Sequence, residues 1–286
     1  MEFSTSDNTH YEKLVEMVEK MIDIQGFNQY LFEEELSENT RVSYVYALRD
    51  FAEKFTAVNK FNVIMWKQEL SCGRAPGTVN LRLSAMERYC RFKGIKLDIR
   101  RVRVQRLTSI ENVITLEEYH RLLDGLTSDR YIRHLIIVVL LAKTGARISE
   151  VLRFTRRDLQ KGYVDIRTKG KIRRIYFPQS LNQQLASCLH CLSDDEHLCQ
   201  NRFGKRITAR GVADFLQDCA KRYGINEKHL HPHAFRHMFA IEFLKRNSNI
   251  SLLADILGHV GVNTTMIYLR MSQEQQRQEV DRSIDW

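Results

Sequence analysis

Helix-breaking residues are rare in this chain, which restricts the folds that it can adopt. Its 286 residues include only three prolines, Pro76, Pro178 and Pro232, together with 13 glycines. Proline and glycine are the residues that most strongly interrupt regular structure. Between them, apolar residues recur every three or four positions, for example from Val42 to Phe55. The sequence therefore predicts a mainly α-helical protein.

The expected helices form two groups, which predicts two domains. In the first group we expect helices near residues 10–35, 40–55, 61–69 and 78–94, with Ser37 and Thr78 capping the second and the fourth, and a loop over residues 71–77. The predicted organisation is an N-terminal helical domain over residues 1–98, a solvated basic linker over residues 99–112 and a second domain over residues 113–286. A chain of this length is able to bury a core in each domain.

The second domain is expected to combine helices with one β-hairpin. Thr115 and Glu118 form the capping-box pattern of a helix start. Apolar and polar residues alternate in Tyr163–Arg167 and again in Arg173–Phe177, which is typical of strands. The residues between these strands suit a tight turn with Lys169 at its tip. The predicted class is therefore mainly α, with a small antiparallel hairpin in the second domain.

The charge of the chain favours a polyanionic partner. Lysine and arginine number 44 against 35 aspartates and glutamates, which gives a net charge of +9 and an isoelectric point near 9.3. Such a surplus is typical of proteins that bind nucleic acid, although a basic protein without such a partner stays an alternative.

Neither a membrane span nor a signal peptide is expected. The longest apolar run, Leu135–Ala142, is too short to cross a bilayer. The first residues lack an apolar segment behind a basic one. We therefore expect a cytoplasmic protein whose six cysteines are reduced.

Four residues raise the question of a zinc site. Cys188 and Cys191 are followed by His197 and Cys199, and cysteine with histidine is a common zinc ligand set. The spacing is shorter than in common finger modules, and Cys188 and Cys191 fall on the apolar face of an expected helix. We therefore favour buried thiols, and no metal site or cofactor is expected.

Polar residues of the second domain form an ordered series. Taken one at a time, each has an ordinary explanation, such as a helix-end cation, a solvated lysine or a packed tyrosine. Their order and their spacing are more specific than any single member. The series is Arg147, Lys169, His233, Arg236, His259 and Tyr268.

The segments around these residues resemble the tyrosine recombinase (phage integrase) family. TGARISEVLRF, RTKGKIRRIYFP, HPHAFRHMFA and LGHVGVNTTMIY resemble its four active-site boxes. LSENTRVSYVYALRDF and APGTVNLRLSAMERYCRF resemble its helical core-binding domain. The resemblance covers residues 25–275 and implies a SAM-like core-binding domain followed by a catalytic domain of the DNA breaking-rejoining fold. About 25 residues precede it, which favours a Xer-like recombinase without an arm-binding domain.

The resemblance also implies the reaction, which is phosphoryl transfer from DNA to Tyr268. The products are a 3′-phosphotyrosine and a free 5′-hydroxyl, and strand exchange passes through a Holliday junction. Arg147 and Arg236 are expected to bind the phosphate, because a guanidinium stays charged and donates two hydrogen bonds. No carboxylate cluster for Mg²⁺ is apparent in the sequence. The chemistry is therefore expected to need neither a metal nor ATP.

The remaining roles are implied in the same way. Lys169 is expected to protonate the leaving 5′-oxygen as general acid, and His233 to assist proton transfer with Tyr268. His259 is expected to donate a hydrogen bond to a phosphate oxygen. Glu150, three residues after Arg147, is expected to orient the cluster.

The expected partner is double-stranded DNA with inverted-repeat core sites, bound by a homotetramer that joins two sites. The segment from Leu269 to Trp286 is expected either to dock on a neighbouring subunit, with Val280, Ile284 and Trp286 as anchors, or to pack on its own domain. Contacts to the DNA backbone are expected from lysines and arginines of the linker and the second domain. These are Lys96, Arg100, Arg101, Arg103, Arg106, Arg153, Arg156, Arg157, Arg173 and Arg174.

Two other functions stay open from the sequence. A type IB topoisomerase shares the tyrosine, arginine and lysine chemistry but relaxes supercoils as a monomer. A catalytically silent DNA-binding protein on the same fold is the second alternative, although none of the six expected active-site residues has been lost. Within the recombinases, integration or excision of a small element and resolution of dimers or cointegrates are both compatible with the sequence.

Overall fold

The computed structural model of the chain forms two compact units, Met1–Arg106 and Leu107–Trp286. It describes residues 22–104, 112–168, 171–189, 193–259, 261–269 and 280–284. Within these ranges no helix has the length and apolar character needed to cross a membrane.

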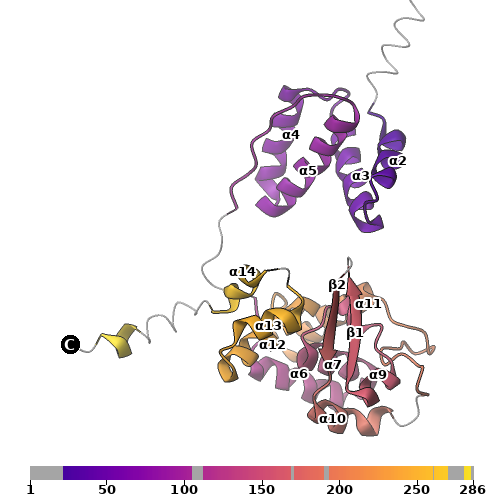
Figure 1. Ribbon diagram of the computed structural model, residues 1–286, viewed down its shortest axis with the longest axis vertical. Helices are drawn as coiled ribbons and strands as arrows, with labels where there is room; N and C mark the ends of the chain where they lie inside the picture. The colour runs from indigo at the N-terminus through magenta and orange to yellow at the C-terminus, as the bar shows by residue number, and fades with distance from the viewer. Residues whose placement is uncertain are drawn as a thin grey trace, which may run out of the picture. The chain divides into compact units, whose positions relative to one another are not determined.

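The first unit consists of helices with a shared apolar core (Figure 1). Helix starts follow from polar side chains that accept hydrogen bonds from free backbone N–H groups. Asp23, Ser37 and Asn59 cap α2, α3 and α4 in this way. The elements are α2 (Ile24–Glu33), α3 (Glu38–Ala52), α4 (Lys60–Gly73) and α5 (Pro76–Phe92).

Two expectations about this unit were wrong. Thr78 does not cap α5, which begins at Pro76 with Ala75 before it. Proline suits the first helical position because its fixed φ fits a helix and its missing N–H would have no partner there. The expected loop over residues 71–77 is shorter, since α4 continues to Gly73. The first expected helix is described only from Ile24, and its earlier part lies outside the described residues.

A buried ion pair joins three helices of the first unit. The Asp50 carboxylate on α3 accepts a hydrogen bond from Trp66 Nε1 on α4 (2.8 Å) and lies 2.7 Å from Nη1 of Arg82 on α5. Burial alone would raise the pKa of Asp50, but the Trp66 hydrogen bond and the Arg82 charge hold it below its ordinary value. The pair fixes these helices relative to one another.

Part of the expected linker packs on the first unit instead of being solvated. Ile99 is buried in the core of that unit. The side chain of Asn80 on α5 donates to the carbonyl of Val102 and accepts from its N–H, both at 2.9 Å. Arg101 forms an ion pair with Glu87 at 2.5 Å. The apolar side chains Ile99 and Val102 gain by leaving water, which explains the difference.

The second unit is built around one apolar helix. This helix, α7 (Ile132–Thr144), contains the apolar run Leu135–Ala142, and every residue of that run is buried. It contacts α6, α10 and α12. The other helices are α6 (Leu116–Ser128), α8 (Ile148–Val151), α9 (Arg156–Lys161), α10 (Gln179–Leu189), α11 (Ala209–Tyr223), α12 (Pro232–Arg246), α13 (Ile250–Leu257), α14 (Val262–Thr265) and the 3-10 helix η1 (Met266–Leu269).

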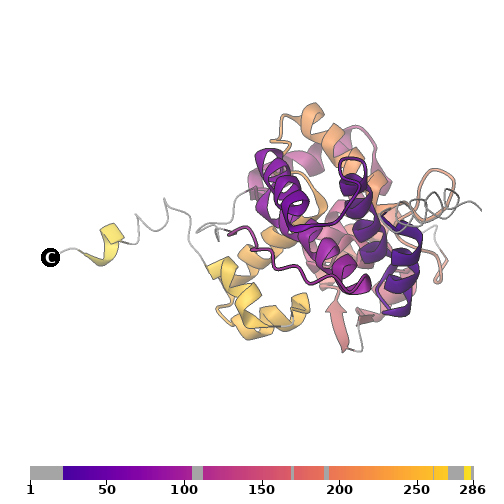
Figure 2. The same ribbon diagram turned by 90° about the horizontal axis from the view of Figure 1, so that it is seen from above.

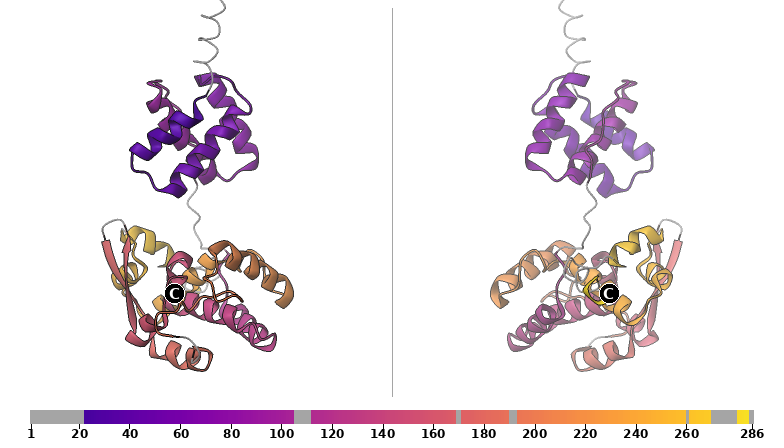
Figure 3. Two further views of the ribbon diagram at one scale, coloured as in Figure 1. Left: turned by 90° about the vertical axis from the view of Figure 1, so that its right-hand side faces the viewer. Right: turned by 90° about the vertical axis from the view of Figure 1, so that its left-hand side faces the viewer.

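The predicted hairpin is confirmed. Strands β1 (Tyr163–Thr168) and β2 (Lys171–Tyr176) pair antiparallel, with Tyr163 opposite Tyr176. β2 contacts α13, and Figure 3 shows the hairpin along one side of the unit. The expected tip residue Lys169 lies outside the described residues. In the part of the chain that the structure describes, mostly helical units and one small antiparallel sheet confirm the predicted fold class.

Helices α13, α14 and η1 form a small cluster with α12. α13 and η1 each contact α12, and α14 contacts α13 and η1; Figure 2 shows these helices together in orange and yellow. Ala240, Leu253, Leu257 and Tyr268 are its buried side chains. Gly258 ends α13 in the left-handed conformation with φ 65°. The cluster brings the end of α13 and η1 against α12, which carries the predicted His233 and Arg236.

Candidate active site

The first predicted arginine follows a sharp turn at the end of α7. Gly145 ends that helix with φ 61°, a conformation that favours glycine. The chain then enters α8, with Arg147 directly before the first helical residue. Glu150 of α8 accepts hydrogen bonds from the backbone N–H of Arg147 at 2.8 Å and from its Nη1 at 3.2 Å. These two hydrogen bonds are compatible with the predicted role of Glu150 in orienting Arg147.

A second arginine reaches the same carboxylate from the hairpin. Nη2 of Arg173 on β2 donates to Glu150, and its Nη1 donates to the backbone carbonyl of Ile256 on α13. The side chains of Arg173 and Glu150 are only 12% and 9% exposed. Burial lowers the pKa of Arg173, and the charge of Glu150 opposes this effect. Arg173 was expected only as a contact to the DNA backbone; the structure places it within the cluster.

Arg236 is the most buried cation of the cluster. It comes from α12, is 4% exposed, and donates to the backbone carbonyls of Gly145 at 2.8 Å and Leu257 at 2.6 Å. Burial, with the nearby charges of Arg147 and Arg173, lowers its pKa to about 10. It is therefore still charged near neutral pH. Because carbonyls hold it and not a carboxylate, its charge is not neutralised.

The charges of this cluster do not balance. It contains the guanidinium groups of Arg147, Arg173 and Arg236. Within the part of the chain that the structure describes, the one carboxylate in an ion pair with any of them is Glu150. No group of three or more histidines, cysteines or acidic residues suited to a metal occurs among the described residues. The cluster is therefore suited to an anion, and an anionic oxygen is the ligand that guanidinium groups bind best.

His233 stands at the start of α12. His231 caps this helix by accepting from the N–H of Ala234 at 3.2 Å, and Pro232 occupies its first position. His233 is exposed, and desolvation by its surroundings with the charges of Arg236 and Arg147 lowers its pKa. The predicted spacing of three residues places His233 and Arg236 on one helical face.

His259 follows the end of α13 and contacts the next helix. Its Nδ1 forms a 2.7 Å hydrogen bond with Oγ1 of Thr265, a fully buried residue. Burial and the charges of Arg236, Arg147 and Arg173 lower the pKa of His259 to about 4. The ring is therefore neutral near neutral pH and carries one N–H.

Tyr268 lies in η1 near two imidazole rings, those of His237 and His259. Its ring stacks on His259, with centroids 6.4 Å apart and an interplanar angle of 12°. Its hydroxyl is hydrogen-bonded to Nδ1 of His237 at 3.0 Å. Tyr268 is 7% exposed, and burial raises its pKa while the charge of Arg236 acts in the opposite direction. The tyrosine is thus held beside the arginine cluster.

The structure brings together five of the six residues of the series. Electrostatic coupling connects Arg147 and Arg236 with both His233 and His259, and Arg236 with Tyr268. Lys169 lies outside the described residues. Sequence reasoning gave no role to His237 or Thr265. His237 contacts Tyr268, which is distant in sequence, and a threonine such as Thr265 does not stand out chemically in a sequence. The position of His237, four residues after His233, was the one signal available.

Comparison with known proteins assigns the family. Residues 112–275 match the phage integrase family, and residues 24–94 match the phage integrase N-terminal SAM-like domain. The chain belongs to the phage integrase family. It is a tyrosine recombinase, an enzyme of site-specific DNA recombination that cleaves and rejoins DNA by way of a tyrosine.

Similar proteins share most of the length of this recombinase. Tyrosine recombinase XerA of Pyrococcus furiosus is 28% identical over 270 residues, which are 91% of this chain and 93% of its own. Tyrosine recombinase XerC of Staphylococcus saprophyticus is 33% identical over 56% of this chain and 57% of its own. These relatives give no support to the topoisomerase or to the silent DNA-binding protein.

Solved structures share the fold. XerH bound to its palindromic difH substrate in a post-cleavage complex has a TM-score of 0.68 at 18% identity, covering 85% of this chain and 79% of that one. A lambda integrase dimer bound to a core site has a TM-score of 0.71 at 14% identity, covering 86% and 93%. DNA is the partner of the recombinase.

The predicted contacts to the DNA backbone differ in their surroundings. Lys96, Arg100, Arg103 and Arg153 are exposed. Arg174 is exposed but forms an ion pair with Asp165, its cross-strand neighbour, at 2.8 Å. Arg101 is paired with Glu87, and Arg106 lies outside the described residues. All remain predictions as DNA contacts.

The cysteines considered for zinc have other surroundings. Cys199 is buried, donates weakly to the carbonyl of Val151 at 3.5 Å, and has a pKa that burial raises to about 12. Nδ1 of His197 lies 3.3 Å from the carbonyl of Arg153. Cys191 lies outside the described residues.

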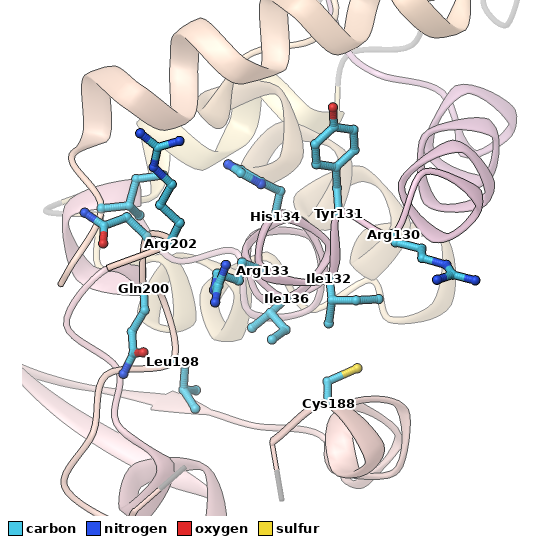
Figure 4. Close-up of a pocket in the computed structure, with 12 residues that line it drawn as sticks. Arg130, Tyr131, Ile132, Arg133, His134, Ile136, Cys188, Leu198, Gln200 and Arg202 are labelled. Carbon is cyan, nitrogen blue, oxygen red and sulfur yellow. The ribbon is translucent and has the colours of Figure 1, made fainter. Parts of the chain in front are cut away.

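One cavity of the recombinase lies away from the arginine cluster. It has a volume of about 580 Å³ and is lined at the N-terminal end of α7 by residues such as Ile132, Ile136 and Arg133 (Figure 4). Arg147 follows the opposite end of α7, about 20 Å along the helix axis at 1.5 Å per residue. The cavity is therefore separate from the candidate active site.

Proposed function

We propose that Tyr268 is the nucleophile of this recombinase and that the arginine cluster binds the scissile phosphate. The observation that carries this proposal is the unbalanced charge of Arg147, Arg173 and Arg236. Among the described residues Glu150 is the one carboxylate paired with them, and Tyr268 lies beside the cluster. A phosphodiester supplies the missing negative charge. The transition state of phosphoryl transfer carries more charge on its oxygens, so fixed guanidinium groups stabilise it further.

The proposed cleavage step forms one bond to phosphorus and breaks another. Tyr268 Oη attacks phosphorus, the bond from phosphorus to the 5′-oxygen breaks, and the DNA strand stays attached as a 3′-phosphotyrosine. Lys169, as the resemblance implies, protonates the leaving 5′-oxygen. The reverse reaction reseals the strand without ATP, because the covalent link retains the phosphodiester energy.

His259 serves as a hydrogen-bond donor to the phosphate. In the free protein its ring is neutral, and a hydrogen bond accepted by Nδ1 from the Thr265 hydroxyl leaves the proton on Nε2. That N–H is then available to a non-bridging phosphate oxygen. His233 lies at the exposed start of α12, where it assists proton movement near the phosphate.

The proposed substrate is double-stranded DNA with an inverted-repeat core site in the cytosol of a bacterium or an archaeon. A homotetramer joins two such sites, and the C-terminal tail docks on a neighbouring subunit. Supporting this, XerH was solved on a palindromic substrate and lambda integrase as a dimer on a core site. In the tail, Val280 and Ile284 are exposed apolar side chains. The proposed domains are residues 1–98 and 113–286, and of the connecting residues 99–112 Ile99 and Val102 pack on the first domain.

Trapping the covalent adduct tests the nucleophile. With nicked DNA that loses the strand beyond the cut, the wild type should accumulate a protein–DNA adduct that survives denaturing electrophoresis. Tyr268→Phe should bind DNA and form no adduct. Tyr223→Phe, which removes a hydroxyl bonded to Asp129 at 3.0 Å in the same unit, is the matched control and should react normally. An adduct formed by Tyr268→Phe would contradict the proposal, and sequencing the trapped DNA identifies the target site.

A further inference from the structure

The hydroxyl of Tyr268 has a partner outside the predicted series. Oη lies 3.0 Å from Nδ1 of His237, and the two rings are 5.6 Å apart between centroids. His237 directly follows Arg236 on α12 and lies one helical turn beyond His233. Its imidazole therefore reaches the reacting oxygen from within the helix that also supplies the buried guanidinium.

The direction of this hydrogen bond follows from the acidities of the two groups. Burial and the positive surroundings of His233, His231 and Arg236 lower the pKa of His237 to about 4, so the ring is neutral near neutral pH. The raised pKa of Tyr268 keeps the phenol protonated. Since a phenol is a much stronger acid than a neutral imidazole, the phenol donates and Nδ1 accepts. The single proton of the imidazole is then on Nε2.

We propose that His237 is the general base that takes the phenolic proton of Tyr268 when the tyrosine attacks DNA. This rests on the proposed role of Tyr268 as nucleophile. As the bond from Oη to phosphorus forms, the proton on Oη passes to Nδ1 of His237, which becomes an imidazolium. The bond from phosphorus to the 5′-oxygen breaks, and that oxygen receives a proton from the general acid. Resealing returns the proton from His237 to Tyr268.

Binding of DNA makes His237 a better base. In the free protein, positive neighbours contribute to its low proton affinity. A phosphate bound by Arg147 and Arg236 places a negative charge beside these groups and opposes their effect. The proton affinity of His237 therefore rises when the substrate is in place, and the imidazolium that forms during attack is stabilised by the same anion.

His233 is less suited to this step. It is exposed at the start of α12, and a full helical turn separates it from His237. Among the contacts of the described residues, the hydrogen bond of the Tyr268 hydroxyl goes to His237. The role that the sequence suggested for His233 toward Tyr268 is thus better filled by His237.

The experiment measures single-turnover cleavage by the full-length protein, using ordinary nicked DNA and the same DNA with sulfur in place of the scissile 5′-oxygen. A thiolate leaves without protonation, so this substrate bypasses the general acid but still requires a base. His237→Ala should slow cleavage of both substrates by about 10²-fold or more, the usual contribution of general base catalysis. Lys169→Ala should be slow with oxygen and largely restored with sulfur. His134→Asn, at a half-buried histidine stacked on Phe215, is the control and should cleave normally.

His237→Asn separates proton transfer from orientation. The amide oxygen accepts the hydrogen bond of Tyr268 but takes no proton. Cleavage by this variant should be slower than wild type near neutral pH and should rise with pH as hydroxide replaces the base, while the wild-type rate levels off. Thermal unfolding and DNA binding establish that each variant is folded; if alanine disrupts folding, the asparagine profile decides.

Several results would overturn the assignment. One is a His237→Ala variant that cleaves as fast as wild type or faster. Faster cleavage would mean that the contact with His237 holds Tyr268 in an inactive position. Restoration by the sulfur substrate would place His237 on the leaving-group side. An asparagine variant with the wild-type rate and pH profile would limit His237 to orientation. In all these cases an inactive Tyr268→Phe keeps the proposed nucleophile, whereas an adduct with Tyr268→Phe refutes that nucleophile instead.

Discussion

Replacing Glu150 by glutamine should strongly destabilise the second unit. The substitution keeps the shape and an oxygen that accepts from the N–H of Arg147, but it removes the charge that faces Arg173. Both side chains of the Arg173–Glu150 pair are nearly buried, so the guanidinium cannot regain water. Removing one partner of a buried ion pair costs about 3–5 kcal/mol. We expect the lower part of this range, because the amide still accepts hydrogen bonds.

The same hairpin offers a control for this prediction. Arg174 pairs with Asp165, and their side chains are 43% and 39% exposed. Exposed ion pairs contribute little to stability because water screens both charges, so Asp165→Asn should leave the unfolding midpoint of the second unit nearly unchanged. Arg173 and Arg174 are adjacent on one strand, yet replacing the acidic partner by its amide should cost much stability for Arg173 and little for Arg174.

Urea unfolding with two probes measures the effect. Far-UV circular dichroism follows both units, and in a Trp286→Phe background the fluorescence of the buried Trp66 reports the first unit alone. Glu150→Gln should shift the transition of the second unit and leave the Trp66 transition unchanged. Sulfate or target DNA should recover part of the loss, because an anion bound to the native cluster stabilises it. A loss for Glu150→Gln that is no larger than the loss for the exposed control would refute the reasoning about buried charge.

Three further predictions concern the surroundings of the cluster. Gly258→Ala should destabilise the second unit by about 1 kcal/mol or more and slow cleavage, because the residue has φ 65° and an added Cβ would meet Arg173. The control is Gly224→Ala in the same urea assay. Gly224 has φ 63° and no atom within 4 Å of an added Cβ, so this variant should show the backbone effect alone. Thr265→Val should slow single-turnover cleavage about tenfold with unchanged DNA affinity, since a buried group that loses its partner costs about 1–3 kcal/mol; normal cleavage would contradict the role of the His259 contact. The pKa values of His237 and His259 are about 4 in the folded protein against 6.5 ordinarily, so the unfolded chain binds protons first as the pH falls. The free energy of unfolding should therefore decrease as the pH drops from about 6.5 to about 4, and His237→Asn should make this decrease smaller. A urea midpoint that stays constant over this range would contradict the prediction.

Local patterns in the sequence were enough to predict most helices and the hairpin. Ser37, and Thr115 with Glu118, cap helices where expected, because a cap depends only on residues within one turn. Thr78 was misassigned for a related reason. α4 continues to Gly73, and α5 begins at Pro76, two residues before Thr78. The proline therefore sets the start of α5 in place of a threonine cap. The packing of Ile99 on the first unit was not predictable, since it depends on apolar surface that distant helices expose.

The sequence by itself determined which side chains are candidates for phosphate chemistry, because Arg147, His233, Arg236, His259 and Tyr268 stand in segments that resemble the family's active-site boxes. Only the tertiary structure decided how their charges and protons are arranged. Arg173 joined the cluster because β2 packs on α13, and Glu150 became the carboxylate shared by two arginines. The hydroxyl of Tyr268 met His237, 31 residues away, because η1 packs on α12. Hydrogen bonds and burial depend on distances in space, and spacing along a chain predicts those distances only within a single helix or hairpin.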